Sequence, residues 1–125
     1  MGKIAGVVVE QAGVLRFVPA SVAQRIVPRT VISMVPGTEL AMTLVEGRVV
    51  SVLSLGSVRR ELLVCDVEGE AVALAGLDIV ASGFYDAHPE GVKVGSAIVP
   101  LLDVAAELRR IEQRFWAERI ESEPR

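Results

Sequence analysis

The feature that most constrains the fold is a series of short apolar runs separated by glycine turns. Gly47–Gly56 (GRVVSVLSLG) and Gly95–Val104 (GSAIVPLLDV) each open at a glycine, run through β-branched and leucine residues, and end at a turn or helix start. Between them lie Leu62–Val67 and Ala71–Val80, on either side of the acidic turn Glu68-Gly69-Glu70. Short strands joined by tight glycine turns are typical of small β-barrels and sandwiches. The sequence therefore predicts a mostly β protein.

Length and composition favour one domain. The chain has 125 residues, and its hydrophobic content is 51% while its aromatic content is only 4%. A chain of this size buries roughly two-thirds of its unfolded surface, which is enough for one core without disulfides. That core must be built from Val, Leu, Ile and Ala, and clustered β-branched residues favour strands. We therefore expect a single domain over residues 1–125, with its core over about 4–108, which unfolds in one cooperative transition.

The first third of the chain predicts a hairpin, a short helix and a further strand. Ile4–Val9 and Val14–Val18 form the hairpin around the turn Gln11-Ala12-Gly13. The helix is predicted from Pro19 through Ile26, because proline suits a first helical turn and three apolar residues share one face. Pro28 ends that helix, and the next strand is predicted over Val31–Val35, before the turn Pro36-Gly37.

The remainder predicts more hairpins and a C-terminal amphipathic helix. The second hairpin pairs Leu40–Val45 with Arg48–Leu55, and the third pairs Ser57–Val67 with Ala71–Val80. Residues 83–91 (GFYDAHPEG) predict a polar loop, and the last strands are predicted over Val92–Val94 and Ile98–Leu101. The helix is expected over about 103–121, with Asp103 as its N-cap, because apolar residues recur there at steps of three and four. These are Leu101, Ala105, Leu108, Ile111 and Phe115.

Charge and composition argue against several function classes. The chain carries 13 basic and 16 acidic residues, and it lacks the basic stripe with aromatics that nucleic-acid binding needs. Cys65 is the single cysteine, so no intramolecular disulfide can form and a cytoplasmic location is the default expectation. The apolar run Ile4–Val9 is too short for a membrane span, so we expect no direct membrane insertion.

We expect neither catalysis nor a cofactor. One His and one Cys offer too few ligands for a metal site, and no phosphate-binding glycine motif occurs. His88 lies beside Asp86 and Glu90 in the expected loop and is interpreted as a solvated histidine. Cys65 lies within a predicted strand, where a small buried hydrophobe is expected. A nucleophilic Cys–His dyad remains the alternative interpretation of these two residues.

The order of these elements resembles the CheW-like adaptor domain of bacterial chemosensory systems. Val14–Pro28 (VLRFVPASVAQRIVP) is similar to the family's passage out of its first hairpin, and Glu61–Val80 to its central hairpin. Leu44–Leu55 falls on the family's motif N-L-R-G-x-V-V-P-V-V-D-L. Val94–Leu108 falls on a later motif, G-x-x-V-P-L-L-D-L, and matches it well at residues 100–103.

The resemblance implies a fold, a function and a set of contacts. The fold is a pair of small five-stranded, SH3-like β-barrels that share one hydrophobic centre. The function is that of a non-catalytic adaptor that binds a chemoreceptor signalling tip, the regulatory domain of a CheA-like histidine kinase, or both. The implied partner contacts lie at the start of the first motif, at Leu44, Val45, Glu46 and Arg48.

The chain departs from the family pattern within that first motif. The motif's asparagine falls on Leu44, its arginine on Glu46, its proline on Ser51 and its aspartate on Ser54. The change at Glu46 reverses a charge. A partner that presents carboxylates to arginine would be repelled there, so we expect standard contacts of a divergent, shortened member to be altered.

The predicted C-terminal helix carries a further candidate contact. Phe115 and Trp116 are adjacent, so they point about 100° apart on a helix. Phe115 continues the apolar stripe, and Trp116 faces elsewhere, beside arginine, as binding hot spots often do. The alternative interpretation is that Trp116 only covers the edge of a barrel.

Two other function classes stay open. The chain could be a small β-domain that dimerises, or that docks through its helix on another signalling scaffold or a GTPase. It could also be a small enzyme or a ligand-binding barrel. The oligomeric state is not determined by the sequence.

Overall fold

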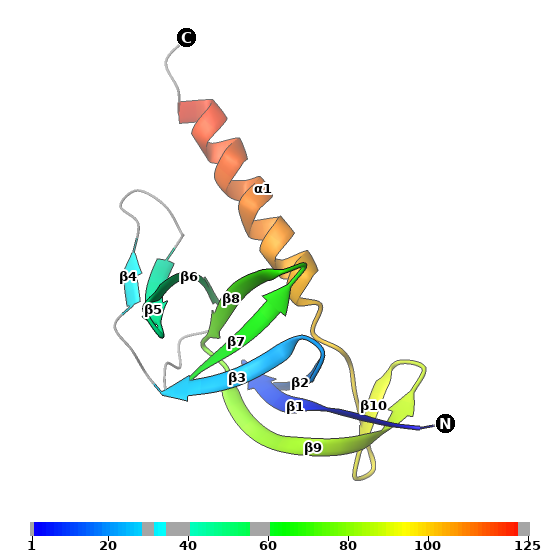
Figure 1. Ribbon diagram of the computed structural model, residues 1–125. Helices are drawn as coiled ribbons and strands as arrows, with labels where there is room; N and C mark the ends of the chain where they lie inside the picture. The colour runs from blue at the N-terminus through cyan, green and yellow to red at the C-terminus, as the bar shows by residue number, and fades with distance from the viewer. Residues whose placement is uncertain (1, 29–31, 35–40, 56–60, 123–125) are drawn as a thin grey trace.

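The computed structural model describes residues 2–28, 32–34, 41–55 and 61–122, and it describes side chains within 2–27, 41–55 and 61–113. In these ranges the protein is mostly β, as the glycine-punctuated apolar runs predict, with two sheets and one long C-terminal helix (Figure 1). Some predicted turns and strand ends fall on residues 29–31, 35–40 and 56–60, which lie outside the described residues.

The first sheet has five strands, all antiparallel to their neighbours. In spatial order they are β11 (Ala97–Val99), β10 (Gly91–Val94), β9 (Asp78–His88), β1 (Lys3–Gln11) and β2 (Val14–Pro19).

The second sheet has six strands, and β6 and β8 run parallel whereas its other pairs are antiparallel. In spatial order they are β3 (Ala23–Pro28), β7 (Glu61–Val67), β8 (Glu70–Ala75), β6 (Arg48–Ser54), β5 (Ala41–Val45) and β4 (Ile32–Met34).

Three hairpins have the same kind of two-residue turn. In each, a non-glycine residue with positive φ precedes a glycine with positive φ: Ala12 and Gly13, Glu46 and Gly47, Glu68 and Gly69. Positive φ at both central residues defines a type I′ turn, whose twist matches that of the flanking strands. The three turns predicted from the sequence are therefore confirmed at β1–β2, β5–β6 and β7–β8.

The first sheet curls until its two edges meet. Leu101, just after edge strand β11, forms a parallel bridge with Phe17 in the opposite edge strand β2. Phe17 N–H donates to the Pro100 carbonyl, and Leu102 N–H donates to the Phe17 carbonyl, both at 2.9 Å. The Phe17 ring meets Tyr85 edge-on inside the curve, with centroids 5.8 Å apart.

Three sequence predictions about local structure are wrong. The predicted helix from Pro19 to Ile26 is instead a turn followed by β3, which pairs with β7 and buries Val27. Tertiary pairing of the β-branched Ile26 and Val27 outweighs the weak helical pattern. The short N-terminal-half helix is thus absent from the described residues.

The predicted polar loop over 83–91 is the second error. Residues 83–88 are the second half of β9, which pairs with β1 and β10, and only the turn around 89–90 remains non-strand. Phe84 and Tyr85 are strand-forming aromatics, and they outweigh the turn-forming residues beside them. The predicted single strand Ala71–Val80 is likewise two strands in different sheets, broken at Gly76, which has a φ of 85°.

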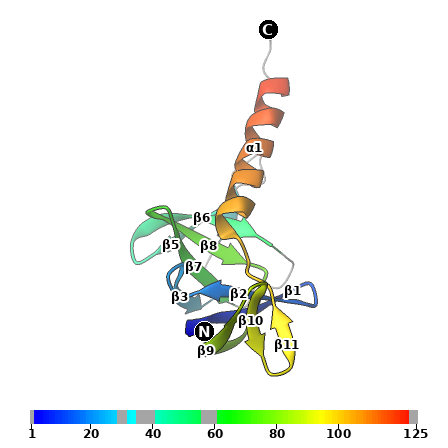
Figure 2. The same ribbon diagram turned by 90° about the vertical axis from the view of Figure 1, so that its right-hand side faces the viewer.

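The C-terminal helix α1 (Val104–Ser122) confirms the helical prediction and its cap. Asp103 Oδ1 accepts a hydrogen bond from Ala106 N–H at 3.0 Å, as an N-cap side chain does. The base of α1 packs on the sheets through Ala105, Leu108 and Ile111. Two perpendicular views show the rest of the helix projecting away from both sheets (Figures 1 and 2).

Three clusters of buried side chains hold the elements together. The first, here called the shared core, joins both sheets and the base of α1: Val9, Val18, Leu53, Leu55, Leu63, Cys65, Val67, Val72, Leu74, Leu77, Leu102 and Val104. The inner core of the second sheet lies on its opposite face: Val27, Ala41, Val45, Val50, Val52, Leu62, Val64, Ala73 and Ala75. The inner core of the first sheet is Val8, Phe17, Val92 and Val99.

A charge placed in the inner core of the second sheet should unfold the protein. Val52 is 4% exposed there, so Val52→Asp would bury a carboxylate without a partner. We expect the free energy of unfolding to fall by more than about 3 kcal/mol in urea titrations. The matched control is Val49→Asp, because Val49 lies on the same strand but is 68% exposed. Equal stability of the two variants would contradict this assignment of the core.

The first sheet should reject a side chain at Gly6 but accept one at its cross-strand partner Gly83. A Cβ at Gly6 would overlap the Phe17 ring and the Val18 carbonyl oxygen, whereas a Cβ at Gly83 meets nothing closer than the Tyr85 hydroxyl at 3.9 Å. We expect Gly6→Ala to cost about 2 kcal/mol through overpacking. Thermal unfolding of both variants measures this, and a Gly83→Ala variant as unstable as Gly6→Ala would overturn it.

Candidate functional site

The first candidate surface is the β5–β6 hairpin, where four of the predicted contact residues meet. Exposure alternates strictly along β5, with Met42 and Leu44 exposed and the residues between them buried. Leu44 pairs with Val49 across the hairpin, and their exposures are 62% and 68%. The hairpin therefore presents an apolar pair to solvent, flanked by Met42.

This apolar surface continues the face of the second sheet that forms the shared core. The register places Leu44 and Val49 opposite each other, Met42 opposite Ser51, and Ser51 opposite Val72. Directly opposed residues share one face of a sheet, and Val72 belongs to the shared core. The first sheet and α1 cover that face at its centre, while the β5–β6 end stays exposed.

Val45 does not contribute to the exposed surface. It is 9% exposed and belongs to the inner core of the second sheet. Its position in the sequence motif suggested a partner contact, but the alternation along β5 turns it inward. Val45 therefore anchors the hairpin, whereas Leu44 and Val49 present its outer face. Val49 was not among the contact residues predicted from the sequence, although its place opposite Leu44 in a two-residue hairpin could have indicated it.

Glu46 carries its charge into an ion pair within the chain. Its Oε1 lies 2.6 Å from Arg25 Nη1, which joins the turn to β3 at the opposite edge region of the sheet. The hydrogen bond and the charge of Arg25 lower the pKa of Glu46, and the charge of Arg48 lowers it further. The carboxylate is therefore matched by two guanidinium groups, and the turn is not the uncompensated negative point that the reversed charge alone suggests.

Phe115 and Trp116 lie in the projecting part of α1. Their side chains are outside the described set, so the predicted hot spot stays a prediction. The base of the helix, through Ile111, is the part that packs on the shared core. The structure thus gathers Leu44, Val45, Glu46 and Arg48 at one turn and puts the two aromatics on a separate element.

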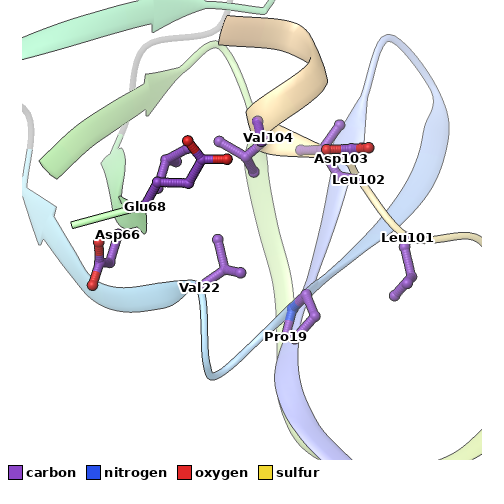
Figure 3. A pocket seen from close by; sticks show the side chains of 10 residues that line it. Pro19, Val22, Asp66, Glu68, Leu101, Leu102, Asp103 and Val104 are labelled. Carbon is purple, nitrogen blue, oxygen red and sulfur yellow. The ribbon is translucent and has the colours of Figure 1, made fainter. Parts of the chain in front are cut away.

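The second candidate surface is a groove of about 420 Å³ at the base of α1 (Figure 3). Three segments far apart in the sequence meet around it: the β2–β3 connection, the β7–β8 turn and the start of α1. Its apolar lining is Pro19, Val22, Val67, Leu101, Leu102, Val104 and Ala105. Its acidic lining is Asp66, Glu68 and Asp103.

Sequence reasoning missed this groove because no single motif carries it. The sequence indicates Asp103 as a helix cap and a motif residue, and Glu68 as a turn residue. The helix predicted over Pro19–Ile26 would direct Val22 elsewhere. A usable signal is present in Pro100–Asp103, where two apolar residues directly precede the helix cap. In the structure the first of them, Leu101, is 52% exposed.

The residues weighed for chemistry are held in structural roles. Cys65 is fully buried in the shared core, and burial raises the pKa of its thiol to about 12. His88 ends β9, where its Nδ1 accepts a hydrogen bond from Glu90 N–H at 3.0 Å. Within the described ranges, no three His, Cys, Asp or Glu residues are grouped as metal ligands would be. None of the described helical residues forms a stretch long and apolar enough to cross a membrane.

Comparison with known proteins adds no assignment. No family model matches the chain, and no curated protein matches its sequence.

The buried thiol should make stability depend on alkaline pH. Because the pKa of Cys65 is higher in the folded protein than its ordinary value of 9.0, the unfolded chain loses the proton first as pH rises. The stability is therefore intact below about pH 9 and falls between pH 9 and about 12, by about 1.4 kcal/mol per pH unit at most. Urea titrations of the protein and of Cys65→Ala across this range isolate the effect. Parallel stability curves for the two proteins would contradict it.

Proposed function

We propose that this protein is a non-catalytic adaptor in bacterial chemosensory signalling. Its partners are a chemoreceptor signalling tip, the regulatory domain of a CheA-like histidine kinase, or both. Its two sheets are proposed to correspond to the two SH3-like barrels of CheW-like adaptors, and it is proposed to act in the cytoplasm without a cofactor. The resemblance of residues 44–55 and 94–108 to the family motifs supports this assignment.

One observation carries the proposal: among the described residues, the hairpin and the groove are apolar surfaces that share no residue. An adaptor must hold two partners at once, and so it needs two surfaces that do not overlap. The hairpin offers Leu44 and Val49, while the groove is lined by other residues on other elements, Leu101 among them. Exposed apolar groups that gather at one place are typical of protein–protein contacts.

A second candidate function is an interaction protein that dimerises or docks on another signalling scaffold or a GTPase. The projection of α1 beyond the sheets favours this candidate (Figure 2). A helical segment of this length without neighbours is marginal in water, so a partner along it would stabilise it. A stable dimer in solution that dissociates on Trp116→Ala would favour this candidate over the chemosensory one.

The adaptor proposal predicts a loss of binding on Leu44→Ser. Leu44 is exposed, so its removal should leave the melting temperature nearly unchanged while the hairpin loses its apolar contact. We expect the affinity for a receptor tip or a kinase regulatory domain to fall about tenfold or more in calorimetric titrations.

The matched control is Val14→Ser, since Val14 is 48% exposed on β2, outside both candidate surfaces. This variant should bind as the unmodified protein does. If the unmodified chain binds neither a receptor tip nor a kinase regulatory domain, the chemosensory assignment is wrong.

A further inference from the structure

The floor of the groove at the base of α1 is built to receive an apolar side chain. Leu101 is 52% exposed there although its backbone is fixed between two hydrogen bonds to Phe17 on either side of it. The turn that carries Val22 is fixed as well, because Val22 N–H donates to the Pro19 carbonyl at 2.9 Å and Asp66 N–H donates to the Val22 carbonyl at 2.8 Å. A preformed apolar concavity of about 420 Å³ is within the size range of ligand sites.

The groove is also acidic. Asp66, Glu68 and Asp103 line it: Asp66 and Glu68 lie on the β7–β8 side of the apolar floor, and Asp103 lies on the α1 side (Figure 3). Glu68 Oε1 is 3.8 Å from Arg109 Nη1, a loose contact between two exposed side chains. Among the described residues, neither Asp66 nor Asp103 forms an ion pair. Three carboxylates against one guanidinium leave a net charge of about −2 at the groove.

The start of α1 does not reverse this sign. A helix N-terminus carries about half a positive charge, which favours anions. Here Asp103 caps that end and Ala106 N–H is bound to its Oδ1, so the positive end is already matched within the chain. The groove therefore keeps a net negative charge after Arg109 and the helix end are counted, and Asp66 holds its orientation by accepting Gly69 N–H at 2.8 Å.

We propose that this groove binds a basic segment of a partner protein, in which a large apolar side chain is flanked by Lys or Arg. The apolar side chain covers the floor around Leu101 and Val22, and the cations meet the carboxylates of the rim. Opposite charges around an apolar contact give both attraction and selectivity over other apolar segments. The inference rests on the proposed function, in which this groove is one of the two binding surfaces.

Two labelled peptides test the proposal against the full chain. One has a Leu-Phe centre flanked by lysines, and the other has the same centre flanked by glutamates. We expect fluorescence anisotropy to show saturable binding of the lysine peptide, weakened by added salt, and none of the glutamate peptide. Equal binding of both peptides, or binding of neither, overturns the proposal. The proposal is also overturned if a second copy of the chain occupies the groove. Self-association that the lysine peptide cannot reverse would show this.

Charge-neutral variants locate the contact without disturbing the fold. In Asp66→Asn, Glu68→Gln and Asp103→Asn combined, the turn and the helix keep their hydrogen-bond acceptors, because Asn caps a helix about as well as Asp. We expect this triple variant to bind the lysine peptide about tenfold more weakly. The control is Glu10→Gln, Glu90→Gln and Glu112→Gln combined, which changes the net charge equally at exposed sites outside the groove. Equal affinity of the two triple variants would assign the attraction to overall charge and overturn the site.

The apolar half of the proposal has its own variant and a separate outcome. Leu101→Ser should weaken binding of the lysine peptide and change the melting temperature of the protein little, since the Leu101 side chain is half exposed. The same proteins are titrated with a receptor tip and a kinase regulatory domain. Binding of those domains without charge selection among the peptides would uphold the adaptor function and overturn this inference. Charge-selective binding of the peptides, with no binding of either domain, would uphold this inference and overturn the adaptor function.

Discussion

The structure depends on the shared core, in which each sheet covers one face of the other. Val9 and Val18 come from the first sheet, and Leu63, Val72 and Leu74 come from the second. Burial of apolar area is the main favourable term in folding, and each sheet alone would leave this face in water. The base of α1 completes the cover through Val104. The helix is therefore fixed at its start, and this fixed start forms one wall of the groove.

The path of the chain couples the two sheets further. The first sheet is built from residues 3–19 and 78–99, and all strands of the second lie between them, within 23–75. The chain crosses from one sheet to the other after β2 and again after β8. The first crossing, at Pro19 to Val22, is also a wall of the groove. Disruption of either sheet therefore displaces the ends of the other, and the groove exists only while both sheets are folded.

The sequence predicted the mostly β fold, the three tight turns and the capped helix, because each depends on neighbouring residues. Positive φ at Glu46 and Gly47, for example, follows from a two-residue hairpin. The sequence-based prediction was wrong where pairing with a distant strand decides the structure. Ala23–Pro28 is a strand because it pairs with β7, and residues 83–88 are a strand because they pair with β1. The exposed pair Leu44–Val49 could be inferred from alternation and register. The groove could not, because its three segments meet only through the crossing of the chain between sheets.

The two surfaces differ in how their charges are used, and this difference suggests different partners. At the hairpin, Arg25 binds the Glu46 carboxylate at 2.6 Å and Arg48 adds a second cation, so that the charge left over is positive. Arg25 and Glu46 act mainly within the chain, where their ion pair ties the β5–β6 turn to β3. At the groove, Asp66 and Asp103 form no ion pair with other described residues, and Glu68 has only a distant one. The groove can therefore select a partner of positive charge, whereas the hairpin offers its apolar pair beside an excess positive charge. For the adaptor function proposed above, surfaces of opposite excess charge would separate two partners, because each surface would disfavour the partner that fits the other.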